Sequence, residues 1–238
     1  MSARQRQATV AISAGDVTLE GALELPAQPA GVVVFSHGSG SGRFSPRNQF
    51  VAAELHKLAL GTLLLDLLTE TEDRDYERRF DIDLLTQRLG HAVRFVRSHA
   101  ATKTLPVGLF GASTGAASAL RVAAAMPKDV GAVVSRGGRP DLAGPGALQQ
   151  VRVPTLLIVG GLDFGVIELN ESASDALVHS ERELVIVPGA THLFEEPGTL
   201  DEVARLAGQW FIRHLTSTRT DSIMRSGDRR RSRIEESP

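Results

Sequence analysis

Short, continuous apolar runs recur along this chain, and they limit its possible folds more than any other feature. The runs are Val32–Phe35, Leu63–Leu65, Val107–Phe110, Val130–Val134, Leu156–Val159 and Leu184–Val187. A strand with one solvent-exposed face alternates apolar and polar residues, whereas a strand buried on both faces of a parallel sheet is apolar throughout. These runs therefore predict the central strands of a mostly parallel sheet.

Segments with helical patterns lie between these runs. They are a helix from Ser45-Pro46 to about Ala59, one over Asp81–His99, one over Ala116–Ala125, one over Ile167–Val178, and a last helix opened by the capping box Thr199–Glu202. Alternation of buried strands with helices is typical of a doubly wound α/β fold. Residues 9–25 alternate instead, which predicts an antiparallel hairpin ahead of the parallel strands.

The chain is expected to form one domain. Its 238 residues lie near the upper size for a single hydrophobic core. We predict a domain over residues 8–215, with no room for a large cap domain, and a disordered tail over residues 216–238, where apolar periodicity is absent. The basic cluster Arg229–Arg231 with Arg233 in that tail is interpreted as solvated, and the alternative is a contact with nucleic acid or an anionic membrane. Thr69–Phe80 is interpreted as a charged loop.

Composition excludes several classes of site. The chain has no cysteine, so disulfides, a thiol nucleophile and iron–sulfur clusters are ruled out. A net charge of −2 argues against nucleic acid as a partner. No metal-ligand motif or phosphate loop is present, so we expect no metal and no cofactor. No apolar segment is long enough to span a membrane and no secretory signal is visible, which favours a cytoplasmic location. The oligomeric state is left open.

The strongest chemical signal is Gly111-Ala112-Ser113-Thr114-Gly115, which follows an apolar strand and precedes a helix. A serine in such a sharp strand-to-helix turn is held in a strained, exposed position, and the residues two places on either side must be small. Ser113 is therefore the candidate nucleophile.

Serine needs a base, and the base needs an acid that holds its tautomer. His192 follows the last predicted strand, where a base facing Ser113 is expected. Asp163 follows the strand Leu156–Val159 and gives the chain order Ser, Asp, His. Asp141, placed after the preceding strand, is the alternative acid.

An oxyanion intermediate needs two donors. The backbone N–H of Thr114 is one candidate, and the N–H of Ser39, in the Gly-rich loop after the first buried strand, is the other. We interpret His37 as a brace for that loop. Asp66 is a candidate partner of the same loop or a turn cap.

Three arginines fall near the carboxyl ends of predicted strands, where ligands bind in open α/β sheets. Arg136 follows Val130–Val134, and Arg43 and Arg47 flank the start of the first helix. They are candidate contacts for an anionic acyl or alcohol group, and the alternative for each is a solvated surface arginine.

With these motifs in order, the chain resembles the α/β-hydrolase superfamily and its dienelactone hydrolase-like branch. Ser113, the loop Ser36–Gly40, Gly161-x-Asp163 and Gly189–His192 carry the resemblance, although dienelactone hydrolases carry a cysteine where this chain has Ser113. Ser135–Leu142 and Pro188–Glu195 are also similar to hydrolase-like domains fused to bacterial phosphoribosyltransferases. The transferase half itself is not visible in this chain.

The sequence thus predicts a serine hydrolase that acts on a small ester, thioester or lactone through Ser113, His192 and Asp163. The alternative is a non-catalytic domain of the same fold that serves as a binding or scaffolding module. The presence of all three catalytic residue types favours the enzyme.

Overall fold

The computed structural model describes residues 6–231, with side chains for residues 7–216. In this part of the chain, eight strands form one sheet in the order β1-β2-β4-β3-β5-β6-β7-β8. The strands are β1 (Arg6–Ala14), β2 (Val17–Leu25), β3 (Gly31–Ser36), β4 (Leu60–Leu65), β5 (Val107–Ala112), β6 (Ala132–Arg136), β7 (Thr155–Gly160) and β8 (Arg182–Val187). The pairs from β4 to β8 are parallel, whereas β2 is antiparallel to both β1 and β4.

This arrangement confirms the predicted mostly parallel sheet and the N-terminal hairpin. Strands β3, β4, β5 and β7 are buried along their whole length, as their continuous apolar runs require. Strand β2 alternates, with Leu19, Leu23 and Leu25 on its buried face. Strand β8 forms one edge of the sheet and is the exception among the apolar runs, because most of its residues are exposed or half-buried.

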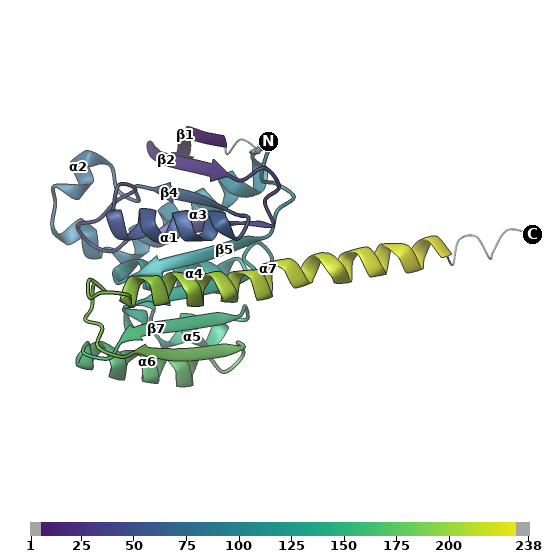
Figure 1. The fold of residues 1–238 in the computed structure, drawn as a ribbon. Helices are drawn as coiled ribbons and strands as arrows, with labels where there is room; N and C mark the ends of the chain where they lie inside the picture. The colour runs from purple at the N-terminus through teal and green to yellow at the C-terminus, as the bar shows by residue number, and fades with distance from the viewer. Residues whose placement is uncertain (1–5, 232–238) are drawn as a thin grey trace, which may run out of the picture.

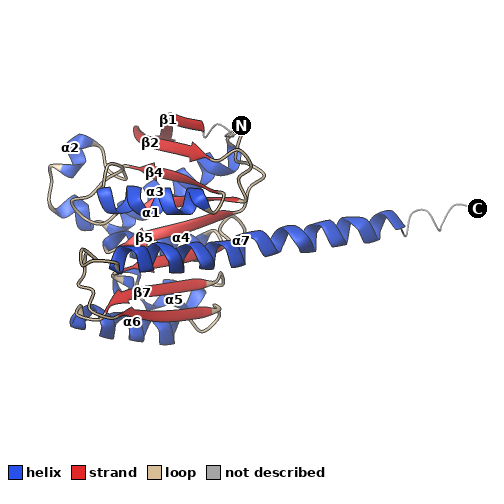
Figure 2. Cartoon of the chain, viewed as in Figure 1, coloured by secondary structure: helices blue, strands red, loops and turns tan. Residues whose placement is uncertain are grey.

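Helices cover both faces of the sheet (Figures 1 and 2). Helices α1 (Pro46–Lys57) and α7 (Thr199–Arg231) pack on one face, and α3 (Ile82–Ser98), α4 (Thr114–Ala125), α5 (Pro145–Gln150) and α6 (Phe164–Ala176) pack on the other. Alternate residues of one strand face opposite cores: Val34 lies in the core beneath α3 and α4, and Phe35 in the core beneath α1 and α7. Two apolar cores on one sheet explain why the runs do not alternate.

Short helices occupy connections where the sequence predicted none. In the charged segment between β4 and α3 the structure has α2 (Glu70–Asp73) and η1 (Glu77–Phe80), and between β6 and α5 it has η2 (Pro140–Ala143). The capping box of α2 is complete, because Thr69 and Glu72 each bond to the other's backbone N–H. Neither connection is large enough to form a cap domain, as predicted from the sequence.

The last helix continues beyond the predicted domain boundary. Helix α7 runs to Arg231 and extends past the end of the sheet (Figure 1), so its backbone is helical in a region for which we predicted disorder. The side chains of Arg229–Arg231 and all of Arg233 lie outside the described residues. The boundary at residue 215 stays a prediction. No helix among the residues that the structure describes has the length and apolar character needed to cross a bilayer.

Candidate active site

Ser113 lies in the sharp turn between β5 and α4. Its backbone has φ 50° and ψ −122°, a conformation that non-glycine residues rarely adopt and that costs about 1–3 kcal/mol. Hydrogen bonds hold this strained residue in place. Its N–H donates to the Arg136 carbonyl at 3.2 Å, and its carbonyl accepts from the N–H groups of Ala116 and Arg139, each at 3.0 Å.

Glycines make this turn possible. A Cβ on Gly115 would lie 2.1 Å from the Ser36 carbonyl oxygen, and one on Gly111 would lie 2.5 Å from the Ala116 Cα. Backbone blocks both positions, so no larger residue fits without moving the strand or the helix. This close approach is the reason that the sequence pattern places small residues two positions on either side of the serine.

Ser113, His192 and Asp163 come together at the carboxyl edge of the sheet. His192 Nδ1 lies 2.6 Å from Asp163 Oδ2, and His192 Nε2 lies 3.3 Å from Ser113 Oγ. A carboxylate at Nδ1 fixes the tautomer in which Nε2 can accept a proton. The alternative acid, Asp141, lies elsewhere and receives two hydrogen bonds from Arg139, at 2.9 and 2.7 Å.

Two loops that meet at the sheet edge bring His192 and Asp163 together. The Leu162 N–H donates to the Ala190 carbonyl at 2.9 Å, and a Cβ on Gly160 would lie 2.4 Å from that same oxygen. The loop after β7 is therefore in direct backbone contact with the loop after β8. Leu162 and Leu193, each adjacent in sequence to one of these two polar residues, are exposed.

The Gly-rich loop after β3 packs on the serine. A Cβ on Gly38 would lie 3.0 Å from Ser113 Cβ. The Ser39 N–H, predicted to face an oxyanion, donates to Thr114 Oγ1 at 3.0 Å. The Thr114 N–H has no partner among the residues that the structure describes, and Thr114 is buried. Sequence patterns gave no indication of the bond between Ser39 and Thr114.

His37 braces this loop, as expected. Its Nδ1–H donates to the Gly38 carbonyl at 3.0 Å, and its Nε2 accepts from the Leu67 N–H at 3.0 Å. The second bond fixes Nε2 as the unprotonated nitrogen. Burial lowers the pKa of His37, so the neutral ring is favoured.

The three predicted arginines have different surroundings. The Arg43 guanidinium is paired with Asp66 and Glu20, and the Arg43 N–H donates to Asp66 Oδ1 at 2.7 Å. Arg43 and Asp66 therefore pin the far end of the Gly-rich loop. Arg47 pairs with Glu195 at 2.7 Å.

Arg136 is the exception, because it is buried and no acidic side chain among the described residues pairs with it. Only 6% of its surface is exposed, and neither Nε nor Nη1 has a hydrogen-bond partner in the described part of the chain. Burial lowers its pKa to about 10, and the positive charge of Arg47 contributes in the same direction. Two guanidinium groups thus lie near each other beneath the carboxyl edge of the sheet.

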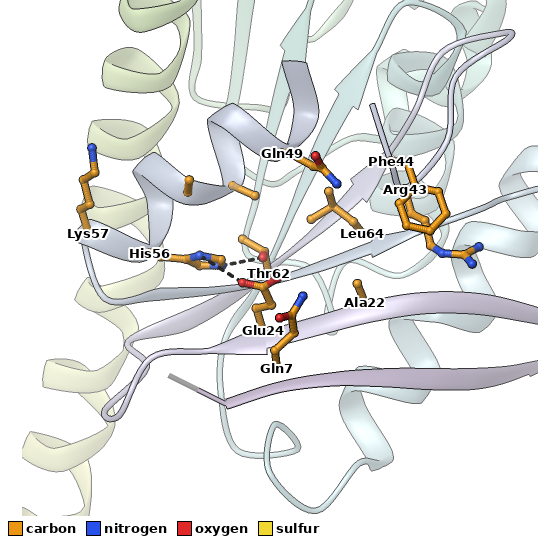
Figure 3. A pocket seen from close by; sticks show the side chains of 12 residues that line it. Gln7, Ala22, Glu24, Arg43, Phe44, Gln49, His56, Lys57, Thr62 and Leu64 are labelled. Carbon is orange, nitrogen blue, oxygen red and sulfur yellow. Dashed lines mark hydrogen bonds and ion pairs between the residues drawn. The ribbon is translucent and has the colours of Figure 1, made fainter. Parts of the chain in front are cut away.

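Two hollows lie outside this cluster. One, of about 730 Å³, lies beside the Gly-rich loop and is lined by Ser39, Arg47 and Asp66 among others. The second, of about 610 Å³, lies between β2, β4 and α1, where His56 bonds to Thr62 at 2.7 Å and faces Glu24 (Figure 3). Neither hollow is lined by Ser113, His192 or Asp163. No group of three or more candidate metal ligands occurs in the described part of the chain.

Comparisons with known proteins identify chains that are similar to this one in sequence and fold. The chain is 51% identical to a dienelactone hydrolase from Anabaena variabilis, with a TM-score of 0.85 over 89% of this chain and 99% of that one. Est1E from Butyrivibrio proteoclasticus has the same fold, with 15% identity and a TM-score of 0.73 over 86% of this chain and 98% of that one. An esterase domain from Rhodothermus marinus also has this fold, with 20% identity and a TM-score of 0.71 over 88% of this chain and 99% of that one. No protein-family model matches the chain.

Among curated proteins, the chain is 54% identical over 211 residues to a putative phosphoribosyl transferase of Mycobacterium tuberculosis, described for two strains. The match covers 88% of this chain and 47% of the relative, so the chain spans about half the length of the curated relatives that it matches.

Proposed function

Because this chain belongs to the dienelactone hydrolase family, whose members have the α/β-hydrolase fold, we propose that it is a serine hydrolase for small carboxylic esters, thioesters or lactones. The observation that carries this proposal is the line of contacts from Asp163 through His192 to Ser113. Serine takes the place of the cysteine expected in dienelactone hydrolases, so the nucleophile depends on His192 for activation.

In the proposed reaction Ser113 Oγ attacks the substrate carbonyl carbon while His192 Nε2 accepts the serine proton. Asp163 stabilises the imidazolium that forms. The Thr114 N–H binds the oxyanion. His192 then gives its proton to the leaving oxygen or sulfur, and an acyl-enzyme remains. Water, activated by His192, releases the acid product. The separation of 3.3 Å between Nε2 and Oγ is usual for a site without substrate.

The substrate that fits best carries an acidic group. A buried guanidinium without a partner destabilises the free protein, and a carboxylate that forms two parallel hydrogen bonds with it offsets that cost. Arg136 is such a group, because its Nε and Nη1 have no partner among the described residues. We assign Arg136 to this role. Arg43 and Arg47 are not part of this assignment, because Asp66 and Glu20 match the charge of Arg43 and Glu195 matches the charge of Arg47.

We assign hydrolase activity, and not the transferase activity in the names of the curated relatives, to this chain. It covers 99% of a dienelactone hydrolase but only 47% of those relatives. The transferase activity is therefore assigned to the half of the relatives that this chain does not match. The cytoplasmic location expected from the sequence stays a prediction.

Active-site labelling tests the proposal. A fluorophosphonate probe should label the wild-type protein, and Ser113→Ala should abolish both labelling and ester turnover without changing the melting temperature. A non-catalytic binding domain would give no labelling above that of the Ser113→Ala variant. A panel of short esters, thioesters and lactones would then define the substrate class.

A further inference from the structure

The residue that follows the nucleophile has two hydrogen-bond donors with no acceptor among the described residues. One is the Thr114 N–H at the start of α4. The other is the Thr114 hydroxyl. Its oxygen accepts a hydrogen bond from the Ser39 N–H at 3.0 Å, but the hydroxyl donates to no acceptor among the described residues. Thr114 is only 2% exposed. Buried donors are nearly always satisfied, so two unused donors beside Ser113 indicate an oxygen atom that the substrate supplies.

The bond between Ser39 and Thr114 decides how that oxygen is held. If the Ser39 N–H were to bind the oxyanion directly, its bond to the Thr114 hydroxyl would first have to break. If that bond is kept, the Ser39 N–H donates to Thr114 Oγ1, and the Thr114 O–H donates to the oxyanion. A hydroxyl that accepts a hydrogen bond becomes a stronger donor, so the second arrangement uses the Ser39 N–H without rearrangement.

We propose that the Thr114 hydroxyl, and not the Ser39 N–H, is the second donor of the oxyanion hole. Ser39 is then a positioning residue that acts through Thr114. The inference rests on the proposed function, because it needs an oxyanion formed by attack of Ser113 Oγ. As the Oγ–C bond forms, the carbonyl π electrons move onto oxygen, where the Thr114 N–H and O–H stabilise them. No proton moves to the oxyanion, and the electron pair returns when the leaving group departs with the proton of His192.

Three variants test this assignment with p-nitrophenyl acetate as the probe. Thr114→Val removes the hydroxyl and preserves the shape, and it should lower kcat about 100-fold with little change in KM, because one oxyanion donor is lost. Thr114→Ser keeps a hydroxyl and should stay within a few-fold of wild type. Thr155→Val is the matched control: Thr155 is also fully buried, and its hydroxyl donates to the Val153 carbonyl at 3.0 Å. Its kcat should not change.

A thionoester supplies a second readout that a structural role would not move. Its sulfur accepts hydrogen bonds poorly, so the wild-type preference for the oxygen ester should shrink in Thr114→Val by about the same factor as the fall in kcat. If Thr114→Val does not fold, Thr114→Ala replaces it in both measurements, because alanine has no atom that threonine lacks.

The outcomes separate this inference from the proposed function. Turnover by Thr114→Val at or above the wild-type rate would overturn the inference, because the Ser39 N–H released by the loss of the hydroxyl would then be the donor. Equal losses in the serine and valine variants would also overturn it. A failure of the fluorophosphonate to label wild-type Ser113 would instead refute the serine hydrolase itself. Slow but complete labelling of Thr114→Val supports both.

Discussion

Replacing Arg136 by methionine should make the protein more stable and less able to use acidic substrates. Arg136 is buried near Arg47, and no carboxylate among the described residues pairs with it. Methionine keeps most of the aliphatic stem and removes the charge. The same substitution should therefore relieve a cost in the free protein and remove a contact in the substrate complex.

The size of the stability effect follows from the pKa of the guanidinium. A pKa lowered by burial to about 10 corresponds to about 3 kcal/mol of destabilisation of the charged side chain in the folded state at neutral pH. Because the pKa is lowered on folding, this cost is fully present below pH 10 and disappears as the pH rises toward the pKa of an arginine in the unfolded chain. Arg136→Met should thus raise the free energy of unfolding by up to about 3 kcal/mol. For a domain of this size that is about 6–12 °C in Tm.

The effect on substrate is measured with a pair of esters that differ by one carboxylate, such as monoethyl succinate and ethyl butyrate. A hydrogen bond to a charged group is worth about 1.5–3 kcal/mol, so KM for the acidic ester should rise roughly 10- to 150-fold. KM for the neutral ester should stay near the wild-type value. Arg136→Lys should recover part of the affinity only, because it lacks the planar fork.

Arg43→Met is the matched control. Arg43 is paired with Asp66 and Glu20, so its loss should lower Tm and leave the ratio of the two KM values unchanged. A drop in Tm for Arg136→Met, together with equal losses on both esters, would refute the reasoning and make Arg136 a structural residue.

Three further outcomes follow from the geometry. Asp163→Asn should lower kcat by about 10⁴-fold with the fold intact, because the amide stabilises the wrong tautomer of His192. Asp141→Asn should leave kcat unchanged, and equal kcat values for the two variants in steady-state kinetics would contradict the assignment of Asp163. Gly115→Ala should abolish activity and soluble yield, because its Cβ would lie 2.1 Å from the Ser36 carbonyl oxygen. Gly146→Ala should be tolerated, because no atom lies within 4 Å of the added Cβ, and an active Gly115→Ala variant would show that the turn can relax. Burial lowers the pKa of His37 from 6.5, so below about pH 6.5 the unfolded chain binds more protons than the folded one, and the stability of the fold should decrease as the pH drops through that range. In thermal melts, the Tm of His37→Gln should decrease less with falling pH than the Tm of the wild type.

The sequence predicts the sheet well because each of its signals is local. A continuous apolar run such as Val107–Phe110 reports a strand covered on both faces without any knowledge of its neighbours. Short helices such as α2 escape this kind of analysis, since four residues are too few to show periodicity. The Thr69–Glu72 capping box was the one local signal available for it.

The candidate site divides in the same way. Ser113, Asp163 and His192 could be found because each follows a predicted strand, and the carboxyl ends of parallel strands share one edge. The partners of Arg43 and Thr114 could not be found. Asp66 lies 23 positions from Arg43, and Ser39 lies 75 positions from Thr114, so neither contact leaves a trace in the local pattern.

The position of β8 at the edge of the sheet has a consequence for how this protein loses activity as it unfolds. Ser113 follows a central strand, whereas His192 follows β8, which among the described strands pairs with β7 alone and whose residues are mostly exposed or half-buried. Edge elements detach at a lower free-energy cost than central ones. Turnover should therefore depend on whether β8 stays paired with β7. In a denaturant titration it should vanish while the fluorescence of Trp210, the one tryptophan and a member of the α7 core, still reports a folded protein.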